Sequence, residues 1–162
     1  MLTRKGAASS HGGIMTDDLG TTLNALAGAM SAAEDDWWIF GSAAMALHGF
    51  EVDVVKDIDV LVSSADAYQL MARHSLANLA DGGSGRFRSD VVLRPAFGAV
   101  PVEILANFRI QNSGIWHAVA IATRVELVFP SGPIFIPSRE ELAAIFLACG
   151  RPKDIERAQA LL

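Results

Sequence analysis

The clearest pattern along the chain is helical. Apolar residues recur at three- and four-residue steps from Leu19 to Ala33, directly after a Thr-Asp-Asp sequence (16–18) that is favoured at a helix N-terminus. Helix-forming runs predict further helices at residues 42–48, 66–79, 142–148 and 153–162. Ser138 and Glu141 have the spacing of a capping box, which predicts that the helix at 142–148 begins there.

Short apolar runs lie between these helices and are rich in β-branched and aromatic residues, as strands are. They predict strands at residues 37–40, 57–62, 86–93, 100–106 and 133–136, with a further β region at about 117–129. Turns are expected at the glycine-rich residues 81–85 and at 130–132. Because strands and helices do not alternate regularly, the pattern predicts an α/β (α+β) fold, a mixed β-sheet with helices packed on it.

Length and composition fit one domain. The chain has 162 residues, of which 51% are hydrophobic, and this is enough apolar material for a core. Residues 1–14 are small, polar and glycine-containing, so we expect a disordered N-terminal lead followed by a single domain over 15–162. Either Met1 or Met15 fits the start of the protein.

Charge and cysteine content exclude several classes of protein. Thirteen Lys and Arg against eighteen Asp and Glu give a net charge of −5, which disfavours a broad nucleic-acid surface but leaves a local basic groove open. The single cysteine, Cys149, excludes an internal disulfide framework and a multi-cysteine zinc site. No apolar run approaches the ~18 residues of a membrane span, and no signal peptide is recognisable. We therefore expect a cytoplasmic protein without membrane contact.

The candidate chemistry is concentrated around two aspartates. Asp57 and Asp59 are two residues apart on a predicted strand, so their carboxylates leave from the same face. Two like charges side by side are costly unless a cation lies between them, and Mg²⁺ prefers hard oxygen ligands of this kind. The spacing therefore predicts a site for a divalent metal ion.

Two further features suit nucleoside triphosphate chemistry. Gly41 and Ser42 lie between a predicted strand and a predicted helix, where backbone N–H groups and a hydroxyl can face an anion. Glu103 is one acid inside another apolar strand, and it is the candidate for a third carboxylate. A phosphate-binding turn beside acidic metal ligands is the arrangement that such chemistry requires.

These segments resemble the nucleotidyltransferase superfamily, which includes DNA polymerase beta and minimal bacterial nucleotidyltransferases. Residues 40–49 (Phe-Gly-Ser-Ala-Ala-Met-Ala-Leu-His-Gly) followed by Lys-Asp-Ile-Asp at 56–59 most resemble the abortive-infection nucleotidyltransferase toxins. Residues 142–154, which end in Gly-Arg-Pro-Lys-Asp, are also similar to that branch. The resemblance covers about 37–154.

The resemblance implies roles for individual residues. Asp57, Asp59 and Glu103 would be the catalytic acids that bind two Mg²⁺ or Mn²⁺ ions, and Gly41 and Ser42 would hold the triphosphate. The remaining nucleotide-binding candidates are Lys56, Arg151, Lys153 and Asp154, for each of which an ordinary surface role is the alternative. The implied reaction transfers a nucleoside monophosphate from a nucleoside triphosphate to an acceptor hydroxyl. The acceptor could be a tRNA end, a protein or a small molecule, and a toxin or antitoxin partner is implied as well.

Two departures keep a second hypothesis open. The third acid is Glu103 where aspartate is commoner, and Phe146 stands where the toxin branch tends to have a lysine. The alternative is a catalytically degenerate nucleotide- or partner-binding module of the same fold. An antitoxin-like protein that binds a basic partner is a third hypothesis, which the net charge of −5 suits.

Overall fold

The computed structural model describes residues 16–162, so the predicted lead at 1–14 and the choice between Met1 and Met15 lie outside the described part. Its helices are α2 (Asp17–Met30), α3 (Gly41–Leu47), α4 (Ser64–His74), α5 (Arg139–Cys149) and α6 (Pro152–Leu161). Its strands are β1 (Trp38–Phe40), β2 (Ile58–Val62), β3 (Phe87–Arg88), β4 (Val91–Leu93), β5 (Val102–Ala106), β6 (Arg109–Asn112), β7 (Ile115–Ala118), β8 (Val125–Phe129) and β9 (Gly132–Ile136). Of the helices described, none has the length and apolar character to cross a bilayer.

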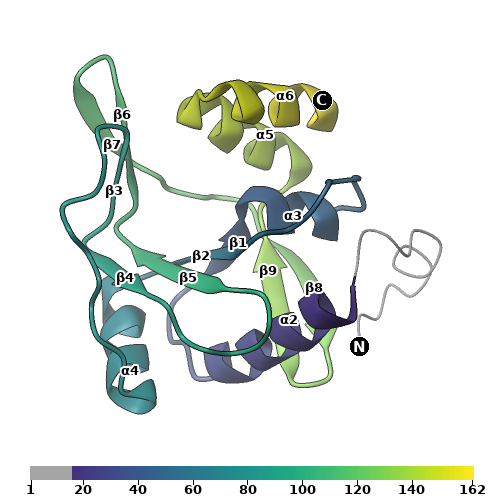
Figure 1. Ribbon diagram of the computed structural model, residues 1–162, viewed down its shortest axis with the longest axis vertical. Coiled ribbons are helices and arrows are strands. Elements are labelled where there is room, and N and C mark those ends of the chain that lie inside the picture. The colour runs from purple at the N-terminus through teal and green to yellow at the C-terminus, as the bar shows by residue number, and fades with distance from the viewer. Residues whose placement is uncertain (1–15) are drawn as a thin grey trace.

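The central sheet has the strand order β1-β2-β5-β4. Strands β2 and β5 are parallel, whereas β1 and β4 run antiparallel to their neighbours. Helices α5 and α6 lie together above this sheet and α4 lies below it (Figure 1). The predicted α/β fold with a mixed sheet and packed helices is therefore confirmed.

The core joins the sheet to helices from both halves of the chain. Leu23 and Leu26 on the apolar face of α2 are fully buried, as are Ile39, Val60 and Ile104 in the sheet. Burial of one such side chain stabilises the fold by roughly 1.5–3 kcal/mol. The helical pattern from Leu19 onward therefore predicts the buried face of α2 correctly, and Thr16 caps this helix by accepting the N–H of Leu19.

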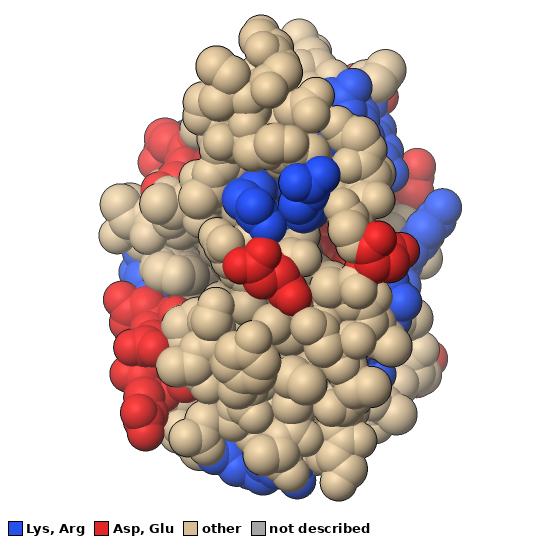
Figure 2. Space-filling view, turned by 90° about the vertical axis from the view of Figure 1, so that its left-hand side faces the viewer, with Lys and Arg blue, Asp and Glu red and all other residues tan. Residues whose placement is uncertain are grey.

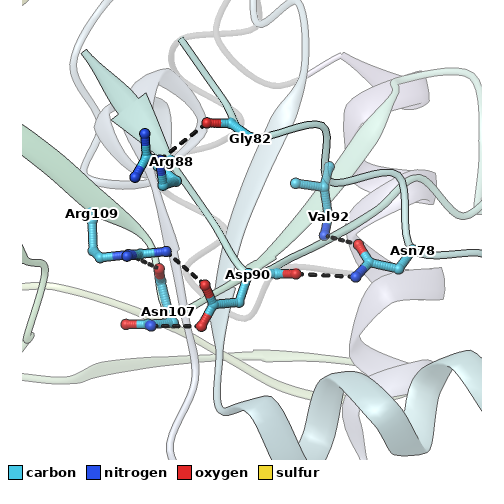
Figure 3. Close-up of polar contacts among 7 residues, drawn as sticks. All are labelled: Asn78, Gly82, Arg88, Asp90, Val92, Asn107 and Arg109. Carbon is cyan, nitrogen blue, oxygen red and sulfur yellow. Dashed lines mark hydrogen bonds and ion pairs between the residues drawn. The ribbon is translucent and has the colours of Figure 1, made fainter. Parts of the chain in front are cut away.

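A second sheet, with the order β3-β6-β7, projects from the central one beside α5 and α6 (Figure 1). We call these three strands the arm. Asp90 ties the arm to the main sheet, because its carboxylate accepts hydrogen bonds from Arg109 and Asn107 at 2.6 and 2.7 Å (Figure 3). Asn78 bonds the carbonyl of Asp90 and the N–H of Val92 in the same network. These contacts fix the arm relative to β4.

Several predicted boundaries are wrong for local reasons. The helix predicted at 66–79 ends at His74, because Ser75 adopts a left-handed conformation with φ 53°. The strand predicted at 86–93 divides into β3 and β4, and the β region at 117–129 divides into β7 and β8. Strand β6 was not predicted, since it carries a single buried side chain, Ile110.

The predicted capping box at the start of α5 forms only in part. Ser138 Oγ accepts the N–H of Glu141 at 3.1 Å, as expected. The Glu141 carboxylate, however, accepts the N–H groups of Ala122 and Thr123, each at 2.8 Å. These hydrogen bonds lower the pKa of Glu141 although partial burial opposes them. Glu141 therefore anchors the segment before β8 to the start of α5.

Candidate active site at the edge of the central sheet

Strand register brings Asp59, Glu103 and Arg94 into one row across the central sheet, and Gly41 lies at the β1 end of this row. Phe40 faces Asp59 between β1 and β2, and Asp59 faces Glu103 between β2 and β5. Gly41 directly follows β1, and Arg94 directly follows β4. The structure thus places Asp59 and Glu103, which are far apart in the sequence, side by side on the sheet.

Asp59 is the most perturbed carboxyl of the row. Burial, together with the negative charges of Asp57 and Glu103, raises its pKa from 3.8 to about 7. The positive charges of Arg151 and Arg157 act in the opposite direction. Asp59 therefore lies in a group of three carboxyls and two arginines that places its pKa near neutral pH.

Asp57 and Lys56 precede β2 and are both exposed. Asp57 lies one residue outside the strand, not within it as predicted. Its charge nevertheless raises the pKa of Asp59, so the two carboxylates interact as the sequence spacing led us to expect. Lys56 stays a candidate nucleotide ligand at the exposed rim.

Glu103 is paired with Arg94, which the sequence analysis missed. Nε and Nη2 of Arg94 both lie 2.9 Å from Oε2 of Glu103. Arg94 follows Leu93, which faces Ile104 in the antiparallel pairing of β4 and β5. In the sequence, Arg94 is marked only as a basic residue after an apolar run. Its pairing with Glu103 can be inferred only when the register of β4 and β5 is known.

The three acids do not form a metal centre as they stand. Within residues 16–162, no group of three or more His, Cys, Asp or Glu side chains has the arrangement of a metal site. The assignment of Asp57, Asp59 and Glu103 as metal ligands therefore stays a prediction, and in this structure Glu103 is paired with Arg94. The donor chemistry still fits a divalent cation, because Asp59 is disfavoured as an anion by its burial and by two neighbouring acids.

Gly41 makes the turn from β1 into α3 and approaches Asp59 closely. Its φ is +69°, and a Cβ atom at this position would lie 3.1 Å from Oδ2 of Asp59. No side chain caps the N-terminus of α3, and Ser42 is partly exposed beside it. The turn therefore requires glycine, and the candidate phosphate ligands Gly41 and Ser42 are adjacent to Asp59.

The closing segment is organised by a buried ion pair. Asp154 is fully buried and accepts hydrogen bonds from Nε and Nη2 of Arg151 at 2.6 and 3.0 Å. It also accepts the Arg151 backbone N–H at 3.2 Å, which caps α6. This pairing raises the pKa of Arg151. Lys153 is exposed on the first turn of α6, so the structure does not bring it together with this pair.

Phe146 belongs to the core, with 3% of its surface exposed. The guanidinium carbon of Arg157 lies 5.7 Å from the centroid of its ring. Arg157 was missed by the sequence analysis, because its relation to Phe146 depends on how α5 and α6 pack together. The i, i+3 spacing from Asp154 was the only local signal.

Two contacts connect the arm to this site. Arg86 donates from Nη1 to the carbonyl of Cys149 at 2.7 Å, which satisfies a carbonyl at the C-terminus of α5. The Arg151 guanidinium carbon lies 5.0 Å from the centroid of the Phe87 ring in β3. Burial, together with the nearby Asp154, raises the pKa of the Cys149 thiol to about 12, which disfavours the reactive thiolate.

Basic and acidic side chains adjoin on the face seen from the side of the arm (Figure 2). Several of the arginines on the arm are already paired: Arg109 with Asp90, and Arg88 with the Gly82 carbonyl and the Trp116 ring. This face is therefore not a uniform basic patch, and the charge that matters for a ligand lies at the row of Asp59.

No protein-family model matches the sequence. No curated protein matches it either. Among solved structures, the crystal structure of a "putative nucleotidyltransferase" (TM1012) from Thermotoga maritima is similar, with a TM-score of 0.66 and 21% sequence identity. The match covers 85% of this chain and 88% of the other. Over most of its length, the chain therefore has the fold of this nucleotidyltransferase structure.

Proposed function

We propose that the protein is a nucleotidyltransferase that moves a nucleoside monophosphate from a nucleoside triphosphate to an acceptor hydroxyl. The observation that carries the proposal is the position of Asp59, a carboxyl between Asp57 and Glu103 and against the Gly41 turn. The fold shared with a nucleotidyltransferase structure supports the same reading. In the reaction, the acceptor oxygen attacks the α-phosphorus, the bond to the β-phosphate oxygen breaks, and pyrophosphate leaves.

Each residue of the row has a proposed part in this reaction. Gly41 and Ser42 bind the triphosphate through backbone N–H groups and a hydroxyl. Asp57 and Asp59 would hold Mg²⁺ or Mn²⁺, and Glu103 would be the third ligand. A divalent cation bound there would neutralise the triphosphate and stabilise the charge that develops on the leaving group. We assign to Glu103 the acceptance of the hydroxyl proton.

The proposal extends to the acceptor and the biological role. The acceptor is a tRNA end, a protein or a small hydroxylated molecule, and the resemblance to abortive-infection toxins favours a toxin–antitoxin setting. A partner toxin or antitoxin would then be a natural protein ligand. Of the basic candidates, Lys56, two residues before β2, and Lys153, on the first turn of α6, are both exposed to solvent.

The direct experiment is incubation with each of the four nucleoside triphosphates, labelled on the α-phosphate, with Mg²⁺ or Mn²⁺ and a cell extract. We expect one class of molecule to become labelled and pyrophosphate to be released. The matched control is Asp59→Asn, which keeps the size of the side chain and removes its charge. Label transfer by Asp59→Asn at the wild-type rate would contradict the proposed role of Asp59.

A catalytically degenerate binding module is the second candidate function. The observation that favours it is the Arg94–Glu103 pair, which engages the third acid of the row. Under this alternative the protein binds a triphosphate, with or without metal, and transfers nothing. Binding of a triphosphate by calorimetry, together with no labelled product from any extract, would favour this module over the enzyme.

A further inference from the structure

Arg157 has a guanidinium whose hydrogen-bonding capacity is unused. Its Nη1 lies 4.0 Å from Oδ1 of Asp154, which is beyond hydrogen-bonding distance. No residue among 16–162 accepts a hydrogen bond from it. The side chain is 30% exposed, so it is neither sealed in the core nor fully hydrated. Its five N–H donors therefore remain available to an incoming oxyanion.

The position of this guanidinium is fixed from two sides. Phe146 supports it from α5, and this ring is itself immobilised in the core. Asp154 attracts it from one turn earlier in α6, and this carboxylate is already held by Arg151. The charge of Arg157 reaches Asp59, whose pKa it lowers. Arg157 is thus close enough to influence the charge of Asp59 but donates no hydrogen bond to the acids of the row.

The other cations near the row are occupied or solvated. Arg151 donates two side-chain hydrogen bonds to Asp154, Arg86 donates to the Cys149 carbonyl, and Arg94 donates to Glu103. Lys56 and Lys153 are exposed to solvent. Of these partly buried arginines, Arg157 differs in that its side chain donates no hydrogen bond to any of residues 16–162.

We propose that Arg157 is a substrate-binding residue that donates to non-bridging oxygens of the triphosphate and holds the phosphate chain beside Asp59. This inference rests on the proposed function, which supplies the triphosphate. A planar guanidinium can donate two parallel hydrogen bonds to one phosphate, which an ammonium group cannot do. Because the contact is to phosphate, it favours no particular base.

The test compares wild type, Arg157→Gln and Arg157→Lys, with Arg139→Gln as the matched control. Arg139 is an exposed arginine at the opposite end of α5, so its loss removes the same charge away from the row. The probes are inorganic tripolyphosphate and ATP with Mg²⁺, titrated calorimetrically at one ionic strength. Arg157→Gln should weaken both probes about tenfold or more, since charge-assisted hydrogen bonds are lost. Arg157→Lys should recover part of the affinity, and Arg139→Gln should stay at the wild-type value.

A second measurement needs no variant that might unfold. Phenylglyoxal modification of the wild type, followed by mass spectrometry, should show that tripolyphosphate protects Arg157 and leaves Arg139 unprotected. Tripolyphosphate affinity equal in wild type and folded Arg157→Gln, or no protection of Arg157, would overturn the inference and leave the proposed function intact. Binding through Arg157 without nucleotidyl transfer would overturn the proposed enzyme and leave the inference standing. A wild type that binds neither probe at millimolar concentration would overturn both.

Discussion

Arg94 donates from both Nε and Nη2 to a single carboxylate oxygen of Glu103, at 2.9 Å each. The pair closes the row of the candidate site on the side opposite to Gly41. A cation that binds the carboxylates must compete with this guanidinium for Glu103. Arg94 therefore acts as the counter-ion of Glu103 in this structure.

The first prediction is that Arg94→Gln strengthens Mg²⁺ binding, because Glu103 becomes free to act as a ligand. The Arg94 side chain is 60% exposed, so loss of the pair should itself cost no more than about 1 kcal/mol of stability. The measurement is the rise in melting temperature during a Mg²⁺ titration. Arg139→Gln is the control. If the Mg²⁺ response of Arg94→Gln equals that of the wild type, pairing with Arg94 does not limit the availability of Glu103 for metal binding.

The second prediction concerns Asp59, whose pKa is raised to about 7. Between about pH 4 and pH 7 the unfolded chain loses this proton while the folded chain retains it, so burial of Asp59 should lower stability as the pH rises through this window. A shift of about three units corresponds to a penalty on the order of 2–4 kcal/mol above pH 7. Urea denaturation at pH 5 and pH 8 measures it.

Asp59→Asn should remove this pH-dependent loss and be the more stable protein at pH 8. Asp53→Asn, which removes an exposed carboxylate, is the control and should keep the wild-type pH dependence. Saturating Mg²⁺ should also recover stability at pH 8 in the wild type but not in Asp59→Asn. If wild type and Asp59→Asn respond alike to pH, the perturbed group is not Asp59.

The third prediction separates backbone strain from the contact with Asp59. Gly41 and Gly49 both have positive φ, +69° and +92°, but a Cβ at Gly49 would meet nothing within 4 Å. Gly41→Ala and Gly49→Ala should each lose about 1 kcal/mol of stability from the left-handed backbone. Gly41→Ala alone should also lose triphosphate affinity, measured by calorimetry. Equal affinity in the two variants would remove Gly41 from the binding site.

The fourth prediction concerns the buried pair at the start of α6. Asp154→Ala leaves the Arg151 guanidinium without its partner and the α6 N-terminus without its cap, so we expect a loss of about 3 kcal/mol. Lys153→Ala, at an exposed position one residue earlier, should change stability by less than about 0.5 kcal/mol. Thermal and urea unfolding measure both. A small effect of Asp154→Ala would mean that the pair does not hold the segment.

Local patterns were enough to predict most of the regular structure. The Leu19–Ala33 periodicity and the N-cap at Thr16 are properties of neighbouring residues, and α2 follows from them. The boundaries that failed depend on single backbone conformations. Ser75 and Asn107 both have positive φ without being glycine, and they lie where a helix ended early and a strand was missed.

Sequence reasoning found the acids of the candidate site and the Gly41 turn beside them, but not its arginines. Asp57 and Asp59 share a local spacing, and Glu103 stands out as an acid in an apolar run. Arg94 and Arg157 could not be found in this way, because each acquires its meaning from a non-local pairing: the β4–β5 register for Arg94 and the α5–α6 packing for Arg157. The repelling carboxylates could therefore be predicted from local sequence, whereas the arginines that offset their charge could not.

The Arg86 bond to the Cys149 carbonyl gives the arm a mechanical connection to the helices above the sheet. With the Arg151–Phe87 contact, it joins the chain at the start of β3 to the corner between α5 and α6 at two points. If a large acceptor enters between the arm and the α5–α6 corner, it must break at least one of these two contacts. Local opening of the corner, visible as faster amide hydrogen exchange at the C-terminal turn of α5, would then limit the rate for large acceptors and not for small ones.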